Sequence, residues 1–549
     1  MRGTRVLART ISALAITLIC AGPALAHQPM TTGTATPIQH VVVIFQENVS
    51  FDHYFGTYPM ALNTGAPGEP NFQADPSTPS VNNLLAAGLL TKNPNFVSPN
   101  GNPFRLTRAE AATCDQDHGY TDEQSAFDLG LMDNFLHFNT GTCTGLVSGQ
   151  PVPNAGHPVD LNMGYYDGNT VTALWNYAQN YAMNDNSYGT TFGPSAPGVV
   201  NLIAGNTNGV DGTTLMDGAA SDTVADGAGG LTLINDAQPG LDTCDSRDNL
   251  SFLSTTKNIG DLLNGAVATW GNFAGGFDLT VINPNGTTGC HRTTSSATGV
   301  FVPKTDYIPH HEGFQFYAST RNPSHTRPAS VSVIGQSDGV TNHQYDLHDF
   351  FDAVNAGNFP AVSILKAEGF QDGHAGYSSP LDEQTFIVNT VNFIESRPEW
   401  ANTLIVVAYD DSDGWYDHQI GPIVSQSDTT ADVGPTGSVN AGKQLCGTKN
   451  SDGIGGRCGY GPRLPFIVIS PFAKKNFVDH TITDQSSIIA FIEDNWGLPH
   501  IPNSMDSIAG PITNMLDFSH RDGEGGAGFL FLDPSTGQPV GHGHGHGDD

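Results

Sequence analysis

The chain has 549 residues, with 54 acidic and 21 basic side chains and a formal net charge of −33. So acidic a surface repels nucleic acids and anionic membranes, and we therefore expect neither as a partner. It also repels phosphate esters, so an anionic substrate would need a metal ion or local cations in order to bind. Abundant glycine and proline with few charged residues indicate long ordered loops on one α/β core.

Residues 1–26 have the pattern of a secretory signal peptide. Arginines at the start precede an apolar run at residues 11–20, and Ala-Leu-Ala at residues 24–26 provides a small-x-small cleavage pattern. The alternative is a membrane anchor, but the apolar run is short for a bilayer span. We therefore expect an exported protein, periplasmic or secreted, without a stable membrane anchor.

The rest of the chain shows no linker or internal repeat that would divide it. We predict a single domain over residues 27–535 and a flexible Gly/His-rich tail over residues 536–549. The alternating histidines of the tail could bind a soft divalent ion, although a solvated tail is the simpler interpretation. The sequence leaves the oligomeric state open.

Six cysteines follow the predicted signal peptide. An even number in an exported chain favours disulfides, and a structural zinc site would require a close Cys-x-x-Cys pair, which is missing from the sequence. Our guess is that neighbours in sequence pair. The predicted disulfides are Cys114–Cys143, Cys244–Cys290 and Cys446–Cys458.

Hydrophobic patterning predicts an alternation of strands and helices, taken here in chain order. The predicted strands are 41–45, 360–366, 403–409 and 464–470, and the predicted helices are 121–138, 170–182, 195–205, 381–397 and a helix that Asp484 caps and that runs to Trp496. Residues 57–105 and 206–256 are rich in turn formers and are predicted to be loop-rich insertions. A strand, a helix and a strand over residues 360–409 indicate a βαβ unit and hence a parallel sheet.

Two predicted buried strands end in polar side chains. Glu47 and Asn48 follow the apolar run 41–45, and Asp410 and Asp411 follow the run 403–409. Adjacent carboxylates repel each other unless a cation or protons intervene. The four side chains form an all-oxygen donor set that suits one divalent ion, with Mg²⁺, Ca²⁺, Mn²⁺ and iron all plausible. The alternative is a solvated turn after each strand, and the matched pair of strand ends favours the metal site.

Ser195 precedes a predicted helix with Pro197 in its first turn and Gly205 at its end. A serine at a helix N-cap lies at the positive end of the helix dipole, beside free N–H groups that also suit a phosphate. A neighbouring metal would lower the pKa of its hydroxyl and make it a nucleophile. A plain capping serine is the commoner role for any single serine.

Histidines in turn-rich contexts are the third candidate group. In an acidic protein their pKa values should tend upward, so that some are protonated under mildly acidic conditions. Protonated histidines could bind phosphate oxygens or protonate a leaving alkoxide, whereas exposure without a role is the alternative for any one of them. The candidates are His118, His310, His311 and His374.

Together these motifs resemble a known family. The resemblance of this sequence to the family rests on four segments: Glu47-Asn48-x-Ser50-Phe51-Asp52-His53, Gly193-Pro194-Ser195, Pro309-His310-His311 and Asp410-Asp411-Ser412-Asp413-Gly414. They are similar to motifs of the bacterial phosphoesterase family that contains acid phosphatases and non-haemolytic phospholipases C. The similarity runs from residue 38 to about residue 497.

The resemblance implies an alkaline phosphatase-like core, a mostly parallel sheet sandwiched by helices, with one metal. It implies that Glu47, Asn48, Asp410 and Asp411 bind that metal and that Ser195 carries the transferred phosphoryl group. His118, His311, His374 and His310 would hold phosphate or act as acid.

Serine as nucleophile and an Asp-Asp pair resemble the acid phosphatase branch more than the phospholipase branch. Two positions depart from the common pattern of the family. Val49 stands where a basic residue is frequent, and Gly198 stands where asparagine is frequent. The hypothesis is an exported, metal-dependent acid phosphatase that hydrolyses phosphate monoesters through a phosphoserine. The alternatives are a phospholipase C that cleaves phosphatidylcholine-type diesters and a non-catalytic surface protein stabilised by calcium.

Overall fold

A computed structural model describes residues 33–141, 143–266, 268–337, 339–450, 453–519 and 528–541. The predicted signal peptide and most of the predicted tail lie outside these ranges. The described residues from Thr34 onward belong to one compact unit. The domain boundaries stay predictions. None of the described helices is both long and apolar enough to cross a bilayer.

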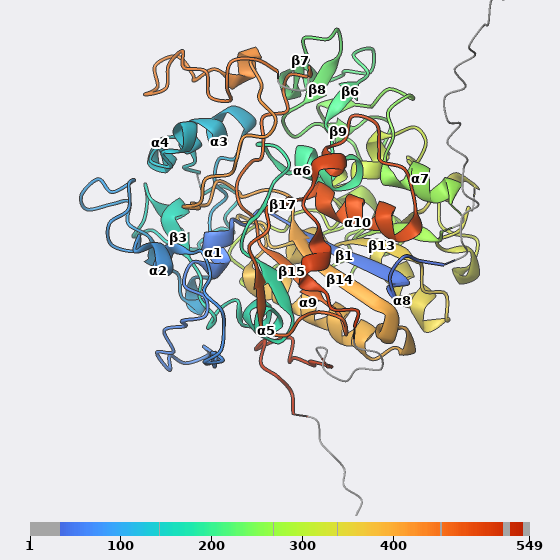
Figure 1. Ribbon diagram of the computed structural model, residues 1–549, viewed down its shortest axis with the longest axis horizontal. Coiled ribbons are helices and arrows are strands. Elements are labelled where there is room, and N and C mark those ends of the chain that lie inside the picture. The colour runs from blue at the N-terminus through green and yellow to red at the C-terminus, as the bar shows by residue number, and fades with distance from the viewer. Residues whose placement is uncertain are drawn as a thin grey trace, which may run out of the picture. The chain divides into compact units, whose positions relative to one another are not determined.

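An eight-stranded sheet forms the centre of this unit (Figure 1). Every neighbouring pair is parallel except the two that involve β15, which runs antiparallel to both of its neighbours. The prediction of a mostly parallel sheet is therefore confirmed. In spatial order the strands are β12 (Gln344–Asp346), β11 (Trp270–Ala274), β13 (Val362–Lys366), β1 (His40–Gln46), β14 (Thr403–Tyr409), β15 (Phe466–Ile469), β4 (Ala182–Asn184) and β16 (Phe477–Asp479).

Strand β1 lies between β13 and β14 at the middle of the sheet. Its residues Val41–Ile44 are completely buried because helices cover both faces of the sheet. In the register Val43 pairs with Ile364 on one side and with Val406 on the other. The three strands are parallel, so their carboxyl ends lie at the same edge of the sheet.

Helices cover the two faces of the sheet in separate groups. One group consists of α6, α7 and α10, in which α6 contacts both of the others, and the other of α5, α8 and α9, where Phe351 of α8 packs on Phe393 of α9. Figure 1 shows the first group above the sheet and the second below it. Their bounds are α5 (Thr172–Asn180), α6 (Ser195–Ala204), α7 (Ile259–Gly265), α8 (Leu347–Asn355), α9 (Pro380–Glu395) and α10 (Ser486–Trp496).

Short elements make up the rest of the described structure. The short helices are α1 (Phe51–Phe55), α2 (Leu84–Ala87), α3 (Tyr120–Phe127) and α4 (Phe135–Phe138). The small sheets pair β2 (Phe104–Arg105) with β3 (Gly164–Tyr165), β5 (Ser187–Tyr188) with β17 (Thr483–Asp484), β9 (Gln238–Pro239) with β10 (Asn249–Leu250), and β8 (Leu231–Leu233) with both β6 (Asn208–Val210) and β7 (Thr223–Ala225). The three predicted disulfides are all present.

The prediction of one continuous helix over residues 121–138 is wrong. Helix α3 ends at Phe127, because Asp128 and Leu129 adopt left-handed backbone angles with φ of 41° and 55°. Leu131, which the predicted spacing placed on the buried face, is 63% exposed. The apparent four-residue spacing therefore joined two separate helices, α3 and α4.

Two further predictions need correction. Residues 206–256 are more than a surface insertion, since they contain the small sheet of β6, β7 and β8 and contribute to the site described below. Asp484 lies at the end of β17, and Gln485 is the N-cap of α10. The Asp484 carboxylate still accepts a hydrogen bond from the Ser486 N–H at 3.3 Å. Asp484 therefore satisfies a free N–H in the first turn of α10, although it lies one residue before the N-cap.

Candidate active site

Helix α6 presents Ser195 at its first turn. Ser195 is the first helical residue, and Pro194 occupies the N-cap, so the prediction that Ser195 itself is the N-cap is off by one position. Pro197 fits the first turn because its missing N–H has no partner to lose there. Gly198 faces the end of β14, where an added Cβ would lie 2.5 Å from the Asp410 carbonyl oxygen. The glycine therefore allows a close approach of α6 to β14.

The Ser195 hydroxyl lies among three of the predicted metal ligands. Its Oγ is 3.0 Å from Glu47 Oε2, 3.2 Å from Asp411 Oδ2 and 3.3 Å from Asn48 Oδ1. All four side chains are buried. Asp410, the fourth predicted ligand, accepts the backbone N–H of Asn48 at 3.0 Å through Oδ1, whereas its Oδ2 is buried and receives no hydrogen bond from the residues that the structure describes. An all-oxygen set with one unsatisfied oxygen fits a hard divalent ion.

The amide of Asn48 joins this oxygen set to the histidines. With the amide turned over, its nitrogen donates to Glu47 Oε2 at 2.8 Å and to Asp410 Oδ1 at 3.2 Å. Its oxygen then accepts from Nε2 of His118 and of His374, each at 3.2 Å. This orientation satisfies both ends of the amide as long as the carboxylates hold no cation. With the amide in the opposite orientation, its oxygen lies beside Ser195 and completes the oxygen set that would hold a cation.

Lys366 is a site residue that the sequence analysis missed. Lys366 is the last residue of β13, and Glu47 comes directly after the neighbouring strand β1. The buried Nζ of Lys366 forms an ion pair with Glu47 Oε1 and lies 3.8 Å from Asp410 Oδ2. Burial alone would lower the pKa of Lys366, but the Glu47 and Asp410 carboxylates raise it above its usual range. The sequence could have indicated this residue, because Lys366 is the charged last residue of the predicted apolar strand at residues 360–366.

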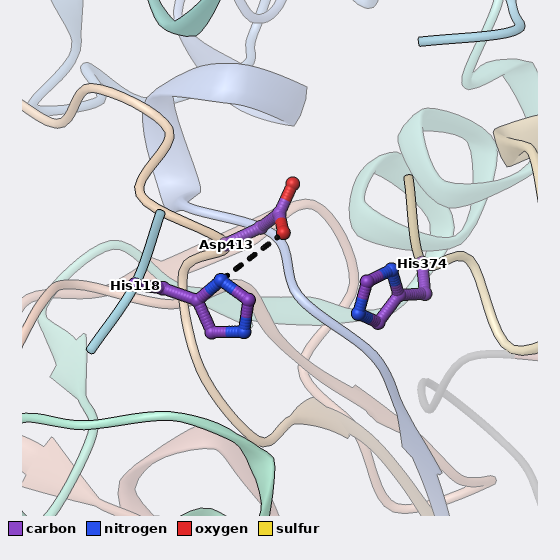
Figure 2. A group of neighbouring side chains, drawn as sticks. All are labelled: His118, His374 and Asp413. Carbon is purple, nitrogen blue, oxygen red and sulfur yellow. Dashed lines mark ion pairs between the residues drawn. The ribbon is translucent and has the colours of Figure 1, made fainter. Parts of the chain in front are cut away.

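His118 and His374 face each other at the mouth of the site. Their ring centroids are 6.0 Å apart, and His118 Nδ1 lies 2.8 Å from the Gln116 carbonyl oxygen and 3.4 Å from Asp413 Oδ1 (Figure 2). Asp413 is fully buried and its φ of 51° is left-handed. Burial opposes protonation of His118, but the carboxylates of Asp411 and Asp413 outweigh it and raise its pKa well above the usual value. The sequence analysis assigned no role to Asp413.

The other two predicted histidines come from the short turn Pro309–His311. His311 Nδ1 is 3.2 Å from Glu47 Oε1, so this histidine contacts the oxygen set directly. His310 lies further out, where its Nε2 is 3.9 Å from Asp236 Oδ2 and its buried Nδ1 makes no hydrogen bond within the described part of the chain. Burial lowers the pKa of both histidines. The structure therefore brings all four predicted histidines to the region of Ser195.

Asp236 is a second residue that the sequence analysis missed. Its Oδ1 accepts the backbone N–H of Ala196 at 2.9 Å, so it occupies a free donor in the first turn of α6. It comes from the insertion 206–256, where no periodicity or motif distinguishes it from the other acidic residues.

Two pockets lie near this constellation and differ in character. A polar pocket of about 350 Å³ is lined mostly by acidic and amide side chains, together with His118, Pro194 and Arg247. A second pocket of about 380 Å³ includes the apolar side chains of Val152, Val159 and Leu161. Gln116 lines both pockets, so they share a wall.

Comparisons with known proteins agree with this chemistry. The profile of the Phosphoesterase family matches residues 38–499. Phospholipase C A of Mycobacterium tuberculosis is 24% identical over 500 residues, which cover 89% of this chain and 78% of that protein. The non-hemolytic phospholipase C of Burkholderia pseudomallei is 23% identical over 506 residues, which cover 90% of this chain and 61% of that protein.

Among solved structures, murine ectonucleotide pyrophosphatase/phosphodiesterase 5 matches with 12% identity and a TM-score of 0.29, over 63% of this chain and 95% of that one. The family match spans most of the chain, including every residue of the oxygen set, Ser195 and the four histidines. The chain belongs to the phosphoesterase family and is a hydrolase that acts on phosphoric ester bonds.

Proposed function

We propose that the protein is a metal-dependent phosphomonoesterase in which Ser195 is the nucleophile. The observation that supports this most directly is the position of Ser195 Oγ, which is buried 3.0 Å from a carboxylate oxygen of Glu47 and 3.2 Å from one of Asp411. A plain capping serine would have no need of two buried carboxylates beside its hydroxyl, because burial of charged groups is costly. The arrangement suits a hydroxyl that attacks phosphorus.

One divalent metal ion would be held by Glu47, Asn48, Asp410 and Asp411. Their oxygens are hard donors that suit Mg²⁺, Ca²⁺, Mn²⁺ or iron. When bound, such an ion lowers the pKa of a neighbouring hydroxyl and stabilises negative charge on phosphate oxygens.

The side chains of the protein itself perform the remaining tasks. The start of α6 directs the positive end of its dipole towards the phosphate, while the Ala196 N–H is accepted by Asp236 and the Gly198 N–H by the Pro194 carbonyl. Nε2 of His118 and of His374 each lies 3.2 Å from the Asn48 amide, and His311 Nδ1 lies 3.2 Å from Glu47 Oε1, so these nitrogens can donate hydrogen bonds to phosphate oxygens. One of them passes a proton to the leaving alcohol, and water then hydrolyses the phosphoserine.

The polar pocket supports a small monoester as the substrate. Its lining offers Arg247 as a cation for a phosphate dianion, although four aspartates also line the pocket. Apart from Gly119 and Pro194, the lining residues have polar or charged side chains, which suit acyl chains poorly. We further propose that the enzyme is exported, periplasmic or secreted, and works on the acid side of neutrality. Three disulfides support an oxidising compartment.

A phospholipase C that cleaves a phosphodiester is the second candidate. The names of the relatives favour it, and so does the second pocket, where Val152 and Val159 could contact an apolar substituent. A calcium-stabilised surface protein is not compatible with the family, whose members are hydrolases.

The test compares both substrate classes in one preparation. We expect hydrolysis of an aryl phosphomonoester between pH 4 and 9 to be chelator-sensitive and faster below pH 7 than above it. Phosphocholine release from phosphatidylcholine should be slower by comparison. Faster hydrolysis of phosphatidylcholine than of the monoester would favour the phospholipase over the phosphomonoesterase. Full activity after exhaustive chelation would contradict the proposed metal dependence.

A further inference from the structure

A second group of buried carboxylates lies at the other end of α6. Glu493 of α10 and Asp506 of the short helix Met505–Ile508 are 0% and 2% exposed, and His500 lies above them with its side chain 53% exposed. Oxygens of the two carboxylates and a ring nitrogen of His500 all lie within 4.8 Å of one another. The predicted metal ligands near Ser195 do not belong to this group.

One backbone donor fixes the direction of both carboxylates. The Ile501 N–H donates to Glu493 Oε1 at 3.2 Å and to Asp506 Oδ2 at 3.0 Å. The remaining oxygens therefore point at His500, with Nδ1 2.8 Å from Glu493 Oε2 and 3.5 Å from Asp506 Oδ1. Asp506 Oδ1 is buried and receives no hydrogen bond from the described residues. A buried oxygen aimed into this polar cluster needs a positive partner, which is either a proton shared with Glu493 or a bound cation.

The negative charge of the two carboxylates is also incompletely balanced by neighbouring cations. Within the described residues, the ion pairs of Glu493 and Asp506 involve only His500, and neither carboxylate pairs with a lysine or an arginine. Burial, together with the neighbouring Asp506 carboxylate, raises the pKa of Glu493 to about 9. At neutral pH the pair therefore retains a proton, and a divalent cation that displaces this proton would neutralise both carboxylates.

We propose that Glu493, His500 and Asp506 bind a divalent transition-metal ion of the Zn²⁺ type. One imidazole and two carboxylates form a mixed nitrogen–oxygen donor set, which suits Zn²⁺ better than the oxygen-preferring Ca²⁺ or Mg²⁺. With bonds of about 2.0–2.2 Å, ligand atoms of a tetrahedral zinc ion are separated by roughly 3.3 Å. The measured separations of 2.8 and 3.5 Å from His500 Nδ1 bracket this value.

The position of the ion indicates a structural role. The helix Met505–Ile508 closes the end of α6, because the Met505 N–H donates to the Gly205 carbonyl at 2.8 Å. Gly205 has φ of 59°, and an added Cβ would lie 2.1 Å from Ser504 Oγ. An ion held by Glu493 and Asp506 would therefore join α10 to the segment that supports the C-terminus of the nucleophile helix.

Zn²⁺ binding to the full mature protein tests this proposal, with His500→Gln as the main variant. His500 is half exposed, so its replacement should not prevent folding. His480→Gln is the matched control, because His480 Nδ1 also lies 2.8 Å from one buried carboxylate, that of Asp185, and is 58% exposed. After dialysis against Zn²⁺, we expect His500→Gln to retain one equivalent fewer than the wild type, with at least about tenfold weaker binding at the lost site. His480→Gln should match the wild type.

Two further measurements separate this site from the predicted ligands near Ser195. Asp411→Asn should leave this equivalent of Zn²⁺ in place, whereas Asp506→Asn should remove it, and the bound ion should be accompanied by release of a proton near pH 7. Zn²⁺ should also raise the melting temperature of the wild type and of His480→Gln but not that of His500→Gln. Equal Zn²⁺ content and equal melting shifts in His500→Gln and wild type would overturn the proposal and leave a carboxyl pair that merely shares a proton.

Discussion

The two ends of helix α6 show two ways to bury carboxylates. At the N-terminal end, the carboxylates of Glu47 and Asp410 lie beside the Lys366 ammonium, a permanent positive charge supplied by the protein. At the C-terminal end, the cationic partner of Glu493 and Asp506 among the described residues is His500. The first cluster is therefore partly neutralised by the protein, whereas the second depends on a proton or an external ion. The two clusters thus differ in whether the protein itself supplies a permanent counter-charge.

Ser195→Ala should give the largest effect. We expect phosphomonoesterase activity to fall by about a thousandfold or more, because no other described hydroxyl lies within the oxygen set. Ser486→Ala is the matched control, since Ser486 is likewise the first residue of a helix, α10, but hydrogen-bonds to Asp484. Steady-state kinetics should show near-normal kcat for the control. A Ser195→Ala enzyme that turns over normally would remove the proposed nucleophile.

Lys366→Met should destabilise the metal-free protein by about 3–5 kcal/mol, because it leaves the buried Glu47 carboxylate without its counter-charge. Urea unfolding in the presence of a chelator measures this loss, and a divalent ion should restore part of it. Lys92→Met, at an exposed position, is the control and should unfold like the wild type. If Lys366→Met were as stable as the control, the ion pair would not balance the cluster.

Glu395 extends the comparison to a buried carboxyl whose partners among the described residues are uncharged donors. It accepts hydrogen bonds from the Tyr181 hydroxyl and from the Leu530 N–H, and burial raises its pKa to about 7 from 4.5. A raised pKa contributes stability that is complete below pH 4.5 and is lost as the pH rises through 7. The shift corresponds to about 3 kcal/mol.

Glu395→Gln should remove this part of the pH dependence. Urea unfolding at pH 5 and at pH 8 should give a smaller difference in unfolding free energy for the variant than for the wild type. An unchanged difference would assign the pH dependence to other buried carboxyls and show that Glu395 titrates normally.

Asp236→Asn should give the smallest effect. It keeps an oxygen that can accept the Ala196 N–H but removes one negative charge from the polar pocket. If the Asp236 carboxylate repels a phosphate dianion in this pocket by about 1 kcal/mol, removing its charge should lower KM roughly fivefold at low salt. The difference should shrink at high salt, where charges are screened. A KM that is unchanged at low salt would show that Asp236 does not act on the incoming substrate.

Residues at strand ends could be predicted, and residues from loops could not. Glu47 and Asp410 each follow an uninterrupted apolar run, so their place at the edge of a parallel sheet follows from the sequence. Lys366 has the same signal, and it was missed because it was treated only as the last residue of a strand. Asp236 reaches α6 from an aperiodic insertion, and its position depends on contacts far apart in the chain.

The mistaken helix over residues 121–138 has a local cause. Spacing of apolar side chains reports a period but not the sign of φ, and the left-handed angles of Asp128 and Leu129 break the helix without changing the spacing. The expectation that the four histidines belong to one site rests on the family resemblance, because nothing in the contexts of His118 or His374 alone fixes where their loops fold. Their roles stay predictions.

The glycine at position 198 also affects how this protein can evolve. The space for a side chain there is filled by the backbone carbonyl of Asp410, which cannot move like the end of a flexible side chain. A mutation at this codon therefore requires α6 to shift away from β14, and Ser195 would move with it. Neighbouring positions would have to change in the same lineage to restore the spacing. Attempts to select new substrate preferences should accordingly vary the walls of the two pockets and leave position 198 unchanged.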